Sequence, residues 1–206
     1  HEGFVVWPAQ DTRLIPYLQK MREDRFPFVL ADAFFPEFNC DYIISDNSFG
    51  SELMINHLIS CGHRSICYFT AVPNRVSNSE RMAGVIAGLS KSHIPITVDT
   101  INIIPSADPI VSNLACAQNV GYLEARLKHL LSLPQPPTAI FASNDVIAMS
   151  IYNILDGMGV SVPGEVSLAG FDNIDASQYF KIPLTTVAQD FFGMGQLAGK
   201  VIMSRR

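Results

Sequence analysis

The stretch P-T-A-I-F-A-S-N-D-V-I-A-M-S-I-Y-N-I-L-D-G-M-G-V-S-V-P-G-E-V-S-L-A-G-F-D-N, residues 137–173, decides the fold. Residues 138–142 form a short uncharged apolar run, which is typical of a strand buried on both faces of a parallel sheet. Residues 143–145 are all helix-capping types, and apolar residues then recur every three or four positions. A second apolar run follows at residues 166–171. The stretch therefore predicts a strand, a helix and a second, parallel strand.

Polar side chains stand at the carboxyl ends of both predicted strands. Asn144 follows the first strand, and Asp172 ends the second. Ligands of open parallel sheets bind at this edge. The Asn144 amide offers a donor and an acceptor, and the Asp172 carboxylate can accept from adjacent sugar hydroxyls. Each residue also has a structural alternative. Asn144 could cap the helix, a role that Asp145 could fill instead, and Asp172 could be an ordinary turn residue.

The rest of the chain continues the alternation of strands and helices. Further strands are expected at residues 3–7, 26–32, 42–44, 66–70 and 101–104, with a strand-like crossing at 185–188. Helices are expected to begin near residues 11, 46, 78 and 113, and after the crossing. This order predicts an α/β fold with doubly wound parallel sheets and helices on both faces.

Five stretches, in register along nearly the whole chain, resemble the LacI/GalR family of bacterial repressors. They are D-N-S-F-G with H-L-I-S-C-G-H-R-S-I (46–66), S-E-R-M-A-G (79–84), P-T-A-I-F-A-S-N-D-V-I-A-M-S (137–150), V-P-G-E-V-S-L-A-G-F-D-N (162–173) and I-P-L-T-T-V-A-Q-D (182–190). The resemblance is to the effector-binding core of these repressors, which has the type I fold of periplasmic sugar-binding proteins.

The resemblance implies two lobes. Residues 1–62 and 189–206 would form part of the first lobe, residues 63–182 the second, and residues 183–188 a crossing between them. The family also carries two βα units before the matching segment, two strands after it, and a helix-turn-helix head that binds operator DNA. We therefore expect a partial first lobe with an exposed apolar edge strand at residues 3–7, in a chain that belongs to a longer, dimeric protein.

Arg81 is the strongest candidate for a ligand contact. A cation in the first turn of a helix opposes the helix dipole, so its placement suggests another use. A guanidinium can hold two hydroxyls or an acidic group of a ligand. The structural alternative is a solvent-exposed arginine. The R-x-x-G pattern of Arg81 and Gly84 matches the family.

The resemblance implies that Arg81, Asn144 and Asp172 contact a sugar from the second lobe. Three aromatic residues complete the predicted site. Trp7 could stack on a sugar face, Phe49 lies at the next cleft-facing turn, and Phe191 matches a position that lines the effector pocket. Ordinary core packing is the alternative for the first and last of these.

Composition limits the function classes. The 206 residues are 48% hydrophobic and 16% charged, and 14 basic against 19 acidic residues give a net charge of −5. This balance argues against a nucleic-acid surface on this chain itself. No apolar run approaches the ~18 residues that span a bilayer, and no secretory signal opens the chain. We therefore expect a soluble cytoplasmic protein.

The cysteines raise the question of a metal site. Cys61, His63 and Cys67 are close in sequence, but Cys67 lies in an apolar strand and Cys61 at a helix end. Their side chains need not converge. We expect the four cysteines to be buried free thiols and the chain to hold no metal and no cofactor.

Motifs for catalysis are absent from the sequence, which lacks a nucleophile elbow, a P-loop, a dinucleotide fingerprint and a zinc-protease helix. The sequence thus predicts a sensor of a small effector, a sugar or derivative, and not an enzyme. One alternative is a solute-binding protein of a sugar transporter, which requires a signal peptide and has no use for unpaired thiols. The other is an enzyme on a doubly wound fold.

Overall fold

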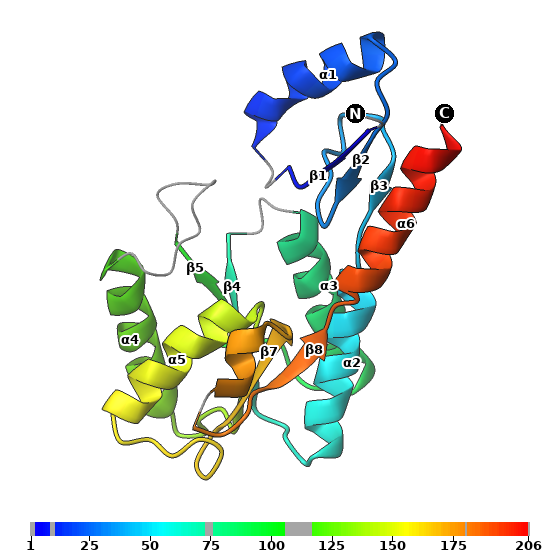
Figure 1. The fold of residues 1–206 in the computed structure, drawn as a ribbon. Helices are drawn as coiled ribbons and strands as arrows, with labels where there is room; N and C mark the ends of the chain where they lie inside the picture. Colours follow the sequence, from blue (N-terminus) through cyan, green and yellow to red (C-terminus); the bar gives the residue numbers. More distant parts are fainter. Residues whose placement is uncertain (1–2, 9–10, 73–75, 106–116, 180, 206) are drawn as a thin grey trace. The chain divides into compact units, whose positions relative to one another are not determined.

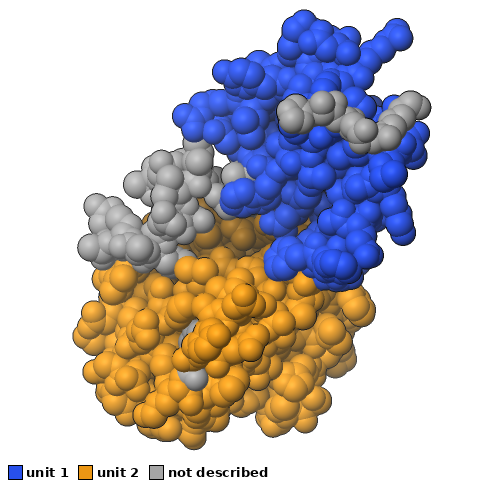
Figure 2. Space-filling view, in the orientation of Figure 1, with its two compact units in different colours: residues 1–46, 190–206 blue, residues 47–189 orange. Residues whose placement is uncertain are grey.

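The computed structural model describes residues 3–8, 11–72, 76–105, 117–179 and 181–205 (Figure 1). The chain divides into two compact units (Figure 2). Unit 1 comprises residues 1–46 and 190–206, and unit 2 comprises residues 47–189. The first unit thus ends before the helix that opens at Asn47, whereas the family resemblance led us to expect it to extend to residue 62.

Unit 2 is built on a five-stranded parallel sheet of order β5-β4-β6-β7-β8. Its strands are β4 (Ile66–Ala71), β5 (Ile101–Ile104), β6 (Ala139–Ala142), β7 (Ser167–Asp172) and β8 (Thr185–Ala188). Its helices are α2 (Asn47–Ser60), α3 (Val76–Lys91), α4 (Ala117–Leu131) and α5 (Asp145–Gly157), with a 3₁₀ turn at Asp175–Tyr179. The predicted start of α4 at Asn113 lies outside the described residues.

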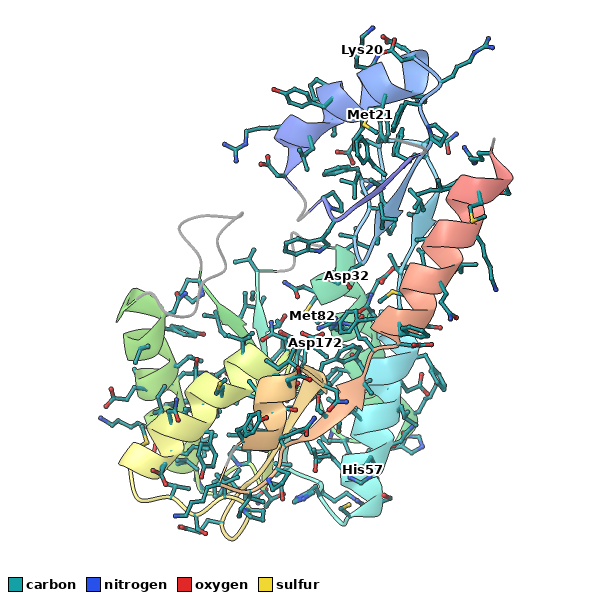
Figure 3. All side chains as sticks on the ribbon, in the orientation of Figure 1. Lys20, Met21, Asp32, His57, Met82 and Asp172 are labelled. Carbon is teal, nitrogen blue, oxygen red and sulfur yellow. The ribbon has the colours of Figure 1, made fainter. Side chains whose placement is uncertain are left out.

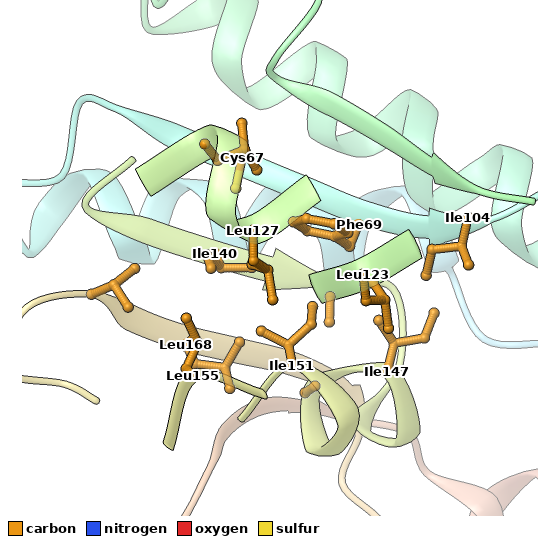
Figure 4. Packing of buried hydrophobic residues seen from close by; sticks show 14 residues of the cluster. Cys67, Phe69, Ile104, Leu123, Leu127, Ile140, Ile147, Ile151, Leu155 and Leu168 are labelled. Carbon is orange, nitrogen blue, oxygen red and sulfur yellow. The ribbon is translucent and has the colours of Figure 1, made fainter. Parts of the chain in front are cut away.

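Helices cover both faces of this sheet, which confirms the predicted doubly wound class. Alternate residues of each strand point to opposite faces, so Phe69 and Ile140 pack with α4 and α5 (Figure 4). Tyr68 and Phe141 pack instead with α2 and α3. The central strands β4 and β6 read as continuous apolar runs because helices cover both of their faces.

Unit 1 holds a smaller parallel sheet of order β1-β2-β3. Its strands are β1 (Phe4–Val6), β2 (Phe28–Ala31) and β3 (Tyr42–Ile43), and its helices are a 3₁₀ turn at Thr12–Leu14, α1 (Ile15–Glu23) and α6 (Phe191–Ser204). Leu18 of α1 packs on one face of this sheet and Ile202 of α6 on the other.

β1 is the edge strand of this small sheet. Among the described strands it pairs with β2 alone, and its residues Phe4 and Val5 are exposed. The expectation of an exposed apolar edge at residues 3–7 is therefore confirmed. No helix in the described part of the chain is long and apolar enough to cross a membrane.

A close contact between α2 and α3 explains the glycine of the R-x-x-G pattern. A Cβ atom placed on Gly84 would overlap the backbone carbonyl of Ser48. Backbone atoms cannot yield as the end of a flexible side chain can. Gly84 is therefore required for the distance at which α3 lies against α2 in unit 2.

This packing predicts that Gly84→Ala lowers the free energy of unfolding by about 2 kcal/mol or more, because overpacking against a rigid neighbour forces the helices apart. Gly121→Ala is the matched control. That glycine lies on an exposed side of α4, and an added Cβ atom would meet nothing within 4 Å. The control should raise stability by up to ~1 kcal/mol through helix propensity. Urea unfolding measures both, and equal effects would contradict the packing argument.

Candidate functional site

Arg81 is buried, with 5% of its surface exposed. The alternative of a solvent-exposed helix arginine is therefore wrong. The helix α3 begins at Val76, so Arg81 lies in its second turn and not in its first. The helix dipole acts mainly within the first turn, so Arg81 does not oppose the dipole, and its placement gives no argument for a second use. A buried charge requires hydrogen-bonding or charged partners.

Four groups of unit 2 surround the Arg81 guanidinium. Its Nε donates to Asn47 Oδ1 at 2.9 Å, and its Nη1 donates to the Ser143 carbonyl oxygen at 2.6 Å. Its Nη2 lies 3.0 Å from Asp172 Oδ1 as an ion pair. Its carbon lies 3.8 Å from the centre of the Phe171 ring, a cation–π distance. A buried charge with such partners is held in one orientation.

Asp172 ends β7 next to α3, at the edge of the sheet that carries the carboxyl ends of the strands (Figure 3). Its φ angle is +110° and that of Asn173 is +54°. L-residues are strained in this region, and such strain persists where surrounding contacts hold it. Asp172 Oδ1 also accepts from Gln189 Nε2 at 2.7 Å. The predicted meeting of Arg81 and Asp172 is confirmed, although their contact with a ligand stays a prediction.

Asn144 is the N-cap of α5. Its Oδ1 accepts from the backbone N–H of Ile147 at 2.8 Å. The expectation that Asp145 could take over the cap is wrong, because Asp145 is the first residue of α5 and its buried carboxylate turns inward. A ligand contact of Asn144 would have to come from its Nδ2 amide group, and this contact stays a prediction.

Asp145 ties α5 to the chain beyond β7. Its carboxylate accepts from the Ile174 backbone N–H at 2.9 Å and from the Thr186 hydroxyl at 2.6 Å. A Cβ atom on Gly170 would overlap this carboxylate. Burial raises the pKa of the Asp145 carboxyl above its ordinary value of 3.8, and the bond from Thr186 only partly offsets this.

Three buried hydroxyls of unit 2 have no hydrogen-bond partner in the described part of the chain. Among the described residues, no atom meets hydrogen-bond geometry with the side-chain oxygens of Ser51, Tyr68 and Ser143. Burial raises the pKa of Tyr68 to about 12, although the neighbouring Thr70 hydroxyl and the Arg81 charge lower it somewhat. The phenol therefore stays neutral at physiological pH. It adds a polar but uncharged group near the ion pair.

The three predicted aromatic residues are exposed. Trp7 is 61% exposed and Phe191 49% exposed, both in unit 1, so the core alternative is wrong for each. Phe49 is 63% exposed and belongs to α2 of unit 2, not to the first lobe. Their part in ligand binding stays a prediction.

The sequence did not predict the hydrogen bonds that hold Arg81 and Asp172 in place. The sequence placed Asn47 with Phe49 at a cleft-facing turn without assigning Asn47 a contact. Ser143 and Gln189 were not among the predicted site residues, although all three residues lie within the family-like stretches. Their position at strand and helix ends, next to a predicted contact, is the signal that could have found them.

The cysteines differ from one another. Cys67 is a buried thiol as expected, and burial raises its pKa to about 12. The expectation of burial is wrong for Cys61, which lies one residue beyond α2 on its solvent side, 3.8 Å from the His57 ring. Cys40 is half-buried, and Cys116 lies outside the described residues. Within the described ranges, no three His, Cys, Asp or Glu side chains form a group that could hold a metal.

Comparison with known proteins shows the family of this chain and finds transcription regulators among its relatives. Residues 55–206 match the model of the periplasmic binding protein-like domain family. The HTH-type transcriptional repressor PurR of Mannheimia succiniciproducens is 31% identical over 164 residues, which are 79% of this chain and 46% of the relative. The repressor CytR of Escherichia coli is 29% identical over 93% of this chain and 53% of the relative. The chain thus spans about half the length of the curated relatives it matches.

A solved structure is similar to nearly the whole chain. The LacI family transcriptional regulator of Enterococcus faecium, solved with bound ribose, superposes with a TM-score of 0.78 at 28% identity. The alignment covers 99% of this chain and 70% of that one.

The buried Asp145 carboxyl gives a test of this site by pH. A raised pKa in the folded state means that protonation stabilises the fold below about pH 4, and that this contribution is lost as the pH rises through the folded pKa. Asp145→Asn keeps a neutral group that can bond Ile174 and Thr186. We therefore expect the wild type to lose stability relative to this variant as the pH rises from about 4 to 7. Urea unfolding across that range measures the difference, and a constant difference would contradict the assignment.

Proposed function

Because the chain belongs to the family of periplasmic binding protein-like domains, we propose that it is the effector-binding core of a transcription regulator that senses a small sugar or sugar derivative. The predicted resemblance to LacI/GalR repressors is confirmed, since the relatives are named as repressors and the solved neighbour as a LacI family regulator. These names do not favour the transporter alternative.

One observation carries the proposal: the buried pair of Arg81 and Asp172 at the carboxyl edge of the unit 2 sheet. This edge is where doubly wound sheets bind ligands. A guanidinium fork and a carboxylate side by side can donate to one hydroxyl and accept from the next. Because Asn47, Ser143 and Gln189 hold the pair, its geometry exists before a ligand arrives. Preorganisation of this kind raises affinity.

Regulation would follow from differential binding. In the complete protein a ligand on this edge would also contact the first lobe, through groups such as Trp7 and Phe191. It would therefore favour one arrangement of the lobes over another. In the homodimer this bias would reach the DNA-binding heads and change their fit to the operator. Couplings between sites are typically ~1–3 kcal/mol.

The enzyme alternative predicts that the protein converts a sugar that it binds. The relatives are named as regulators, and the Asp172 carboxylate is paired with the Arg81 guanidinium. We therefore expect binding without conversion. Any catalysed turnover of a bound sugar would contradict a sensing role.

Calorimetry of the full-length protein against D-ribose and a panel of other sugars tests the proposal. We expect Arg81→Ala to weaken the affinity for the bound sugar by at least about tenfold, because hydrogen bonds from a charged group contribute ~1.5–3 kcal/mol each. The variant also leaves the Asp172 charge without its counter-ion.

Arg126→Ala is the matched control. Arg126 forms a second partly buried arginine–aspartate pair in the described part of unit 2, 2.8 Å from Asp99. Asp99 precedes β5 and so lies at the amino edge of the sheet. Its loss should leave sugar affinity unchanged. Circular dichroism confirms folding of both variants, and a folded Arg81→Ala protein with wild-type affinity would remove Arg81 from the site.

A further inference from the structure

We infer that unit 2 carries a second binding site, at the amino edge of its sheet, for a small organic carboxylate with an apolar body. The site is a cavity of about 530 Å³. Its walls come from the segments that precede β4, β5 and β6, so they lie at the amino ends of these strands, opposite to the edge that holds Arg81. The volume is within the range of small-molecule sites, about 300–1,000 Å³. Binding in this cavity is independent of the sugar site proposed above.

The floor of the cavity is apolar and consists of packed core residues. Cys67 and Leu130 belong to one hydrophobic cluster of unit 2, and Ile66 and Ile94 belong to another. Such residues cannot move into the cavity without opening the core. Three prolines lie in the walls, and their rings fix the backbone φ angle. They are Pro95, Pro134 and Pro137. The cavity therefore exists before a ligand binds, which reduces the entropic cost of binding.

Arg64 lines the cavity and is anchored through one nitrogen. Its Nη1 donates to the backbone carbonyl oxygens of Ile59 and His63, each at 2.8 Å. Ile59 lies in the last turn of α2, so this contact caps the carboxyl end of the helix, where the dipole favours a cation. The two bonds use both N–H groups of Nη1 and hold the guanidinium in one orientation.

The other edge of the Arg64 guanidinium is available to a ligand. In the part of the chain that the structure describes, its Nε and Nη2 atoms take part in no hydrogen bond and no ion pair. The parallel N–H groups of these two nitrogens form the fork that binds both oxygens of a carboxylate. Capping of α2 uses Nη1 alone and does not account for this fork. An anchored arginine with an unused fork thus stands in the wall of a preformed cavity.

The charges around the cavity are compatible with an acid group at Arg64. Asp99 is the acidic residue among those that line the cavity. Its Oδ1 lies 2.8 Å from Arg126 Nη2 and 3.2 Å from His129 Nε2. Because the Asp99 carboxylate already has a counter-ion, its repulsion of a ligand carboxylate is reduced.

The apolar floor determines what the rest of the ligand is. A body rich in hydroxyls would lose hydrogen bonds to water and find no partners on the floor. An aromatic ring or a short alkyl chain would instead bury apolar surface there. The cavity therefore fits an aryl or alkyl carboxylate better than a sugar.

Matched acids and amides test the site. Calorimetry of the full-length protein would compare phenylacetate, indole-3-acetate and octanoate with their amides, with acetate and with inorganic phosphate. We expect one or more of the three acids to bind at least about tenfold more tightly than its amide, because bonds to the Arg64 fork are charge-assisted. Acetate and phosphate lack an apolar body and should bind at least about tenfold more weakly than that acid. Equal affinities of acid and amide, phosphate binding as tight as that of the best acid, or no binding of any acid would overturn the inference.

Arg64→Gln locates the bound acid. The variant lacks the fork, so we expect its affinity for the best acid to fall at least about tenfold, with its affinity for sugar unchanged. Lys91→Gln is the matched control. It removes another exposed cation of unit 2, which is paired with Glu52 at 2.6 Å and lies outside the cavity, and it should leave the affinity for the acid unchanged. An affinity that falls with Arg81→Ala but not with Arg64→Gln would place the acid at the carboxyl edge and overturn the inference.

A pair of charge variants tests the cavity even if Arg64→Gln does not fold. Gln135 is an exposed residue of the cavity wall. Gln135→Glu adds a like charge near the bound acid, and Gln135→Lys adds an opposite one. At low salt (~0.05 M) we expect the acid to bind at least about threefold more tightly to Gln135→Lys than to Gln135→Glu. Circular dichroism checks that both proteins fold, and equal affinities of the two folded variants would show that the acid binds elsewhere.

Discussion

The burial of one guanidinium determines how unit 2 is organised at the carboxyl edge of its sheet. An arginine with 5% of its surface exposed cannot remain without counter-ion and acceptors, because a bare buried charge costs several kcal/mol. Arg81 of α3 therefore holds Asn47 at the start of α2, Ser143 at the end of β6 and Asp172 at the end of β7. Each partner lies at an element end, where polar groups gather at a parallel sheet.

The packing of α3 on α2 makes this arrangement possible. Gly84, three residues after Arg81, lets the α3 backbone approach Ser48, the neighbour of Asn47. The same close approach brings Asn47 within 2.9 Å of the arginine. Gly84 thus allows the close approach of α3 to α2, and Arg81 forms a hydrogen bond to Asn47 in the same region. Both residues of the R-x-x-G pattern therefore have a physical reason.

The two charges at this edge form one pair that neighbouring groups hold. Arg81 and Asp172 cancel one another in charge, and Gln189 and Ser143 hold them in place. The strained backbone of Asp172 is consistent with a position maintained for its side chain.

The sequence by itself determined the parallel α/β units, because strands buried on both faces must be apolar throughout and helices between them must carry one apolar face. It also determined that Asp172 and Asn144 end neighbouring strands, and the family motifs pointed to Arg81. Only the tertiary structure decided which groups pair. Arg81 bonds to residues 34 and 62 positions away, and no local periodicity reports such partners. The choice of Asn144 over Asp145 as the helix cap, the membership of α2 in unit 2 and the exposure of Cys61 depend likewise on contacts between elements distant in the chain.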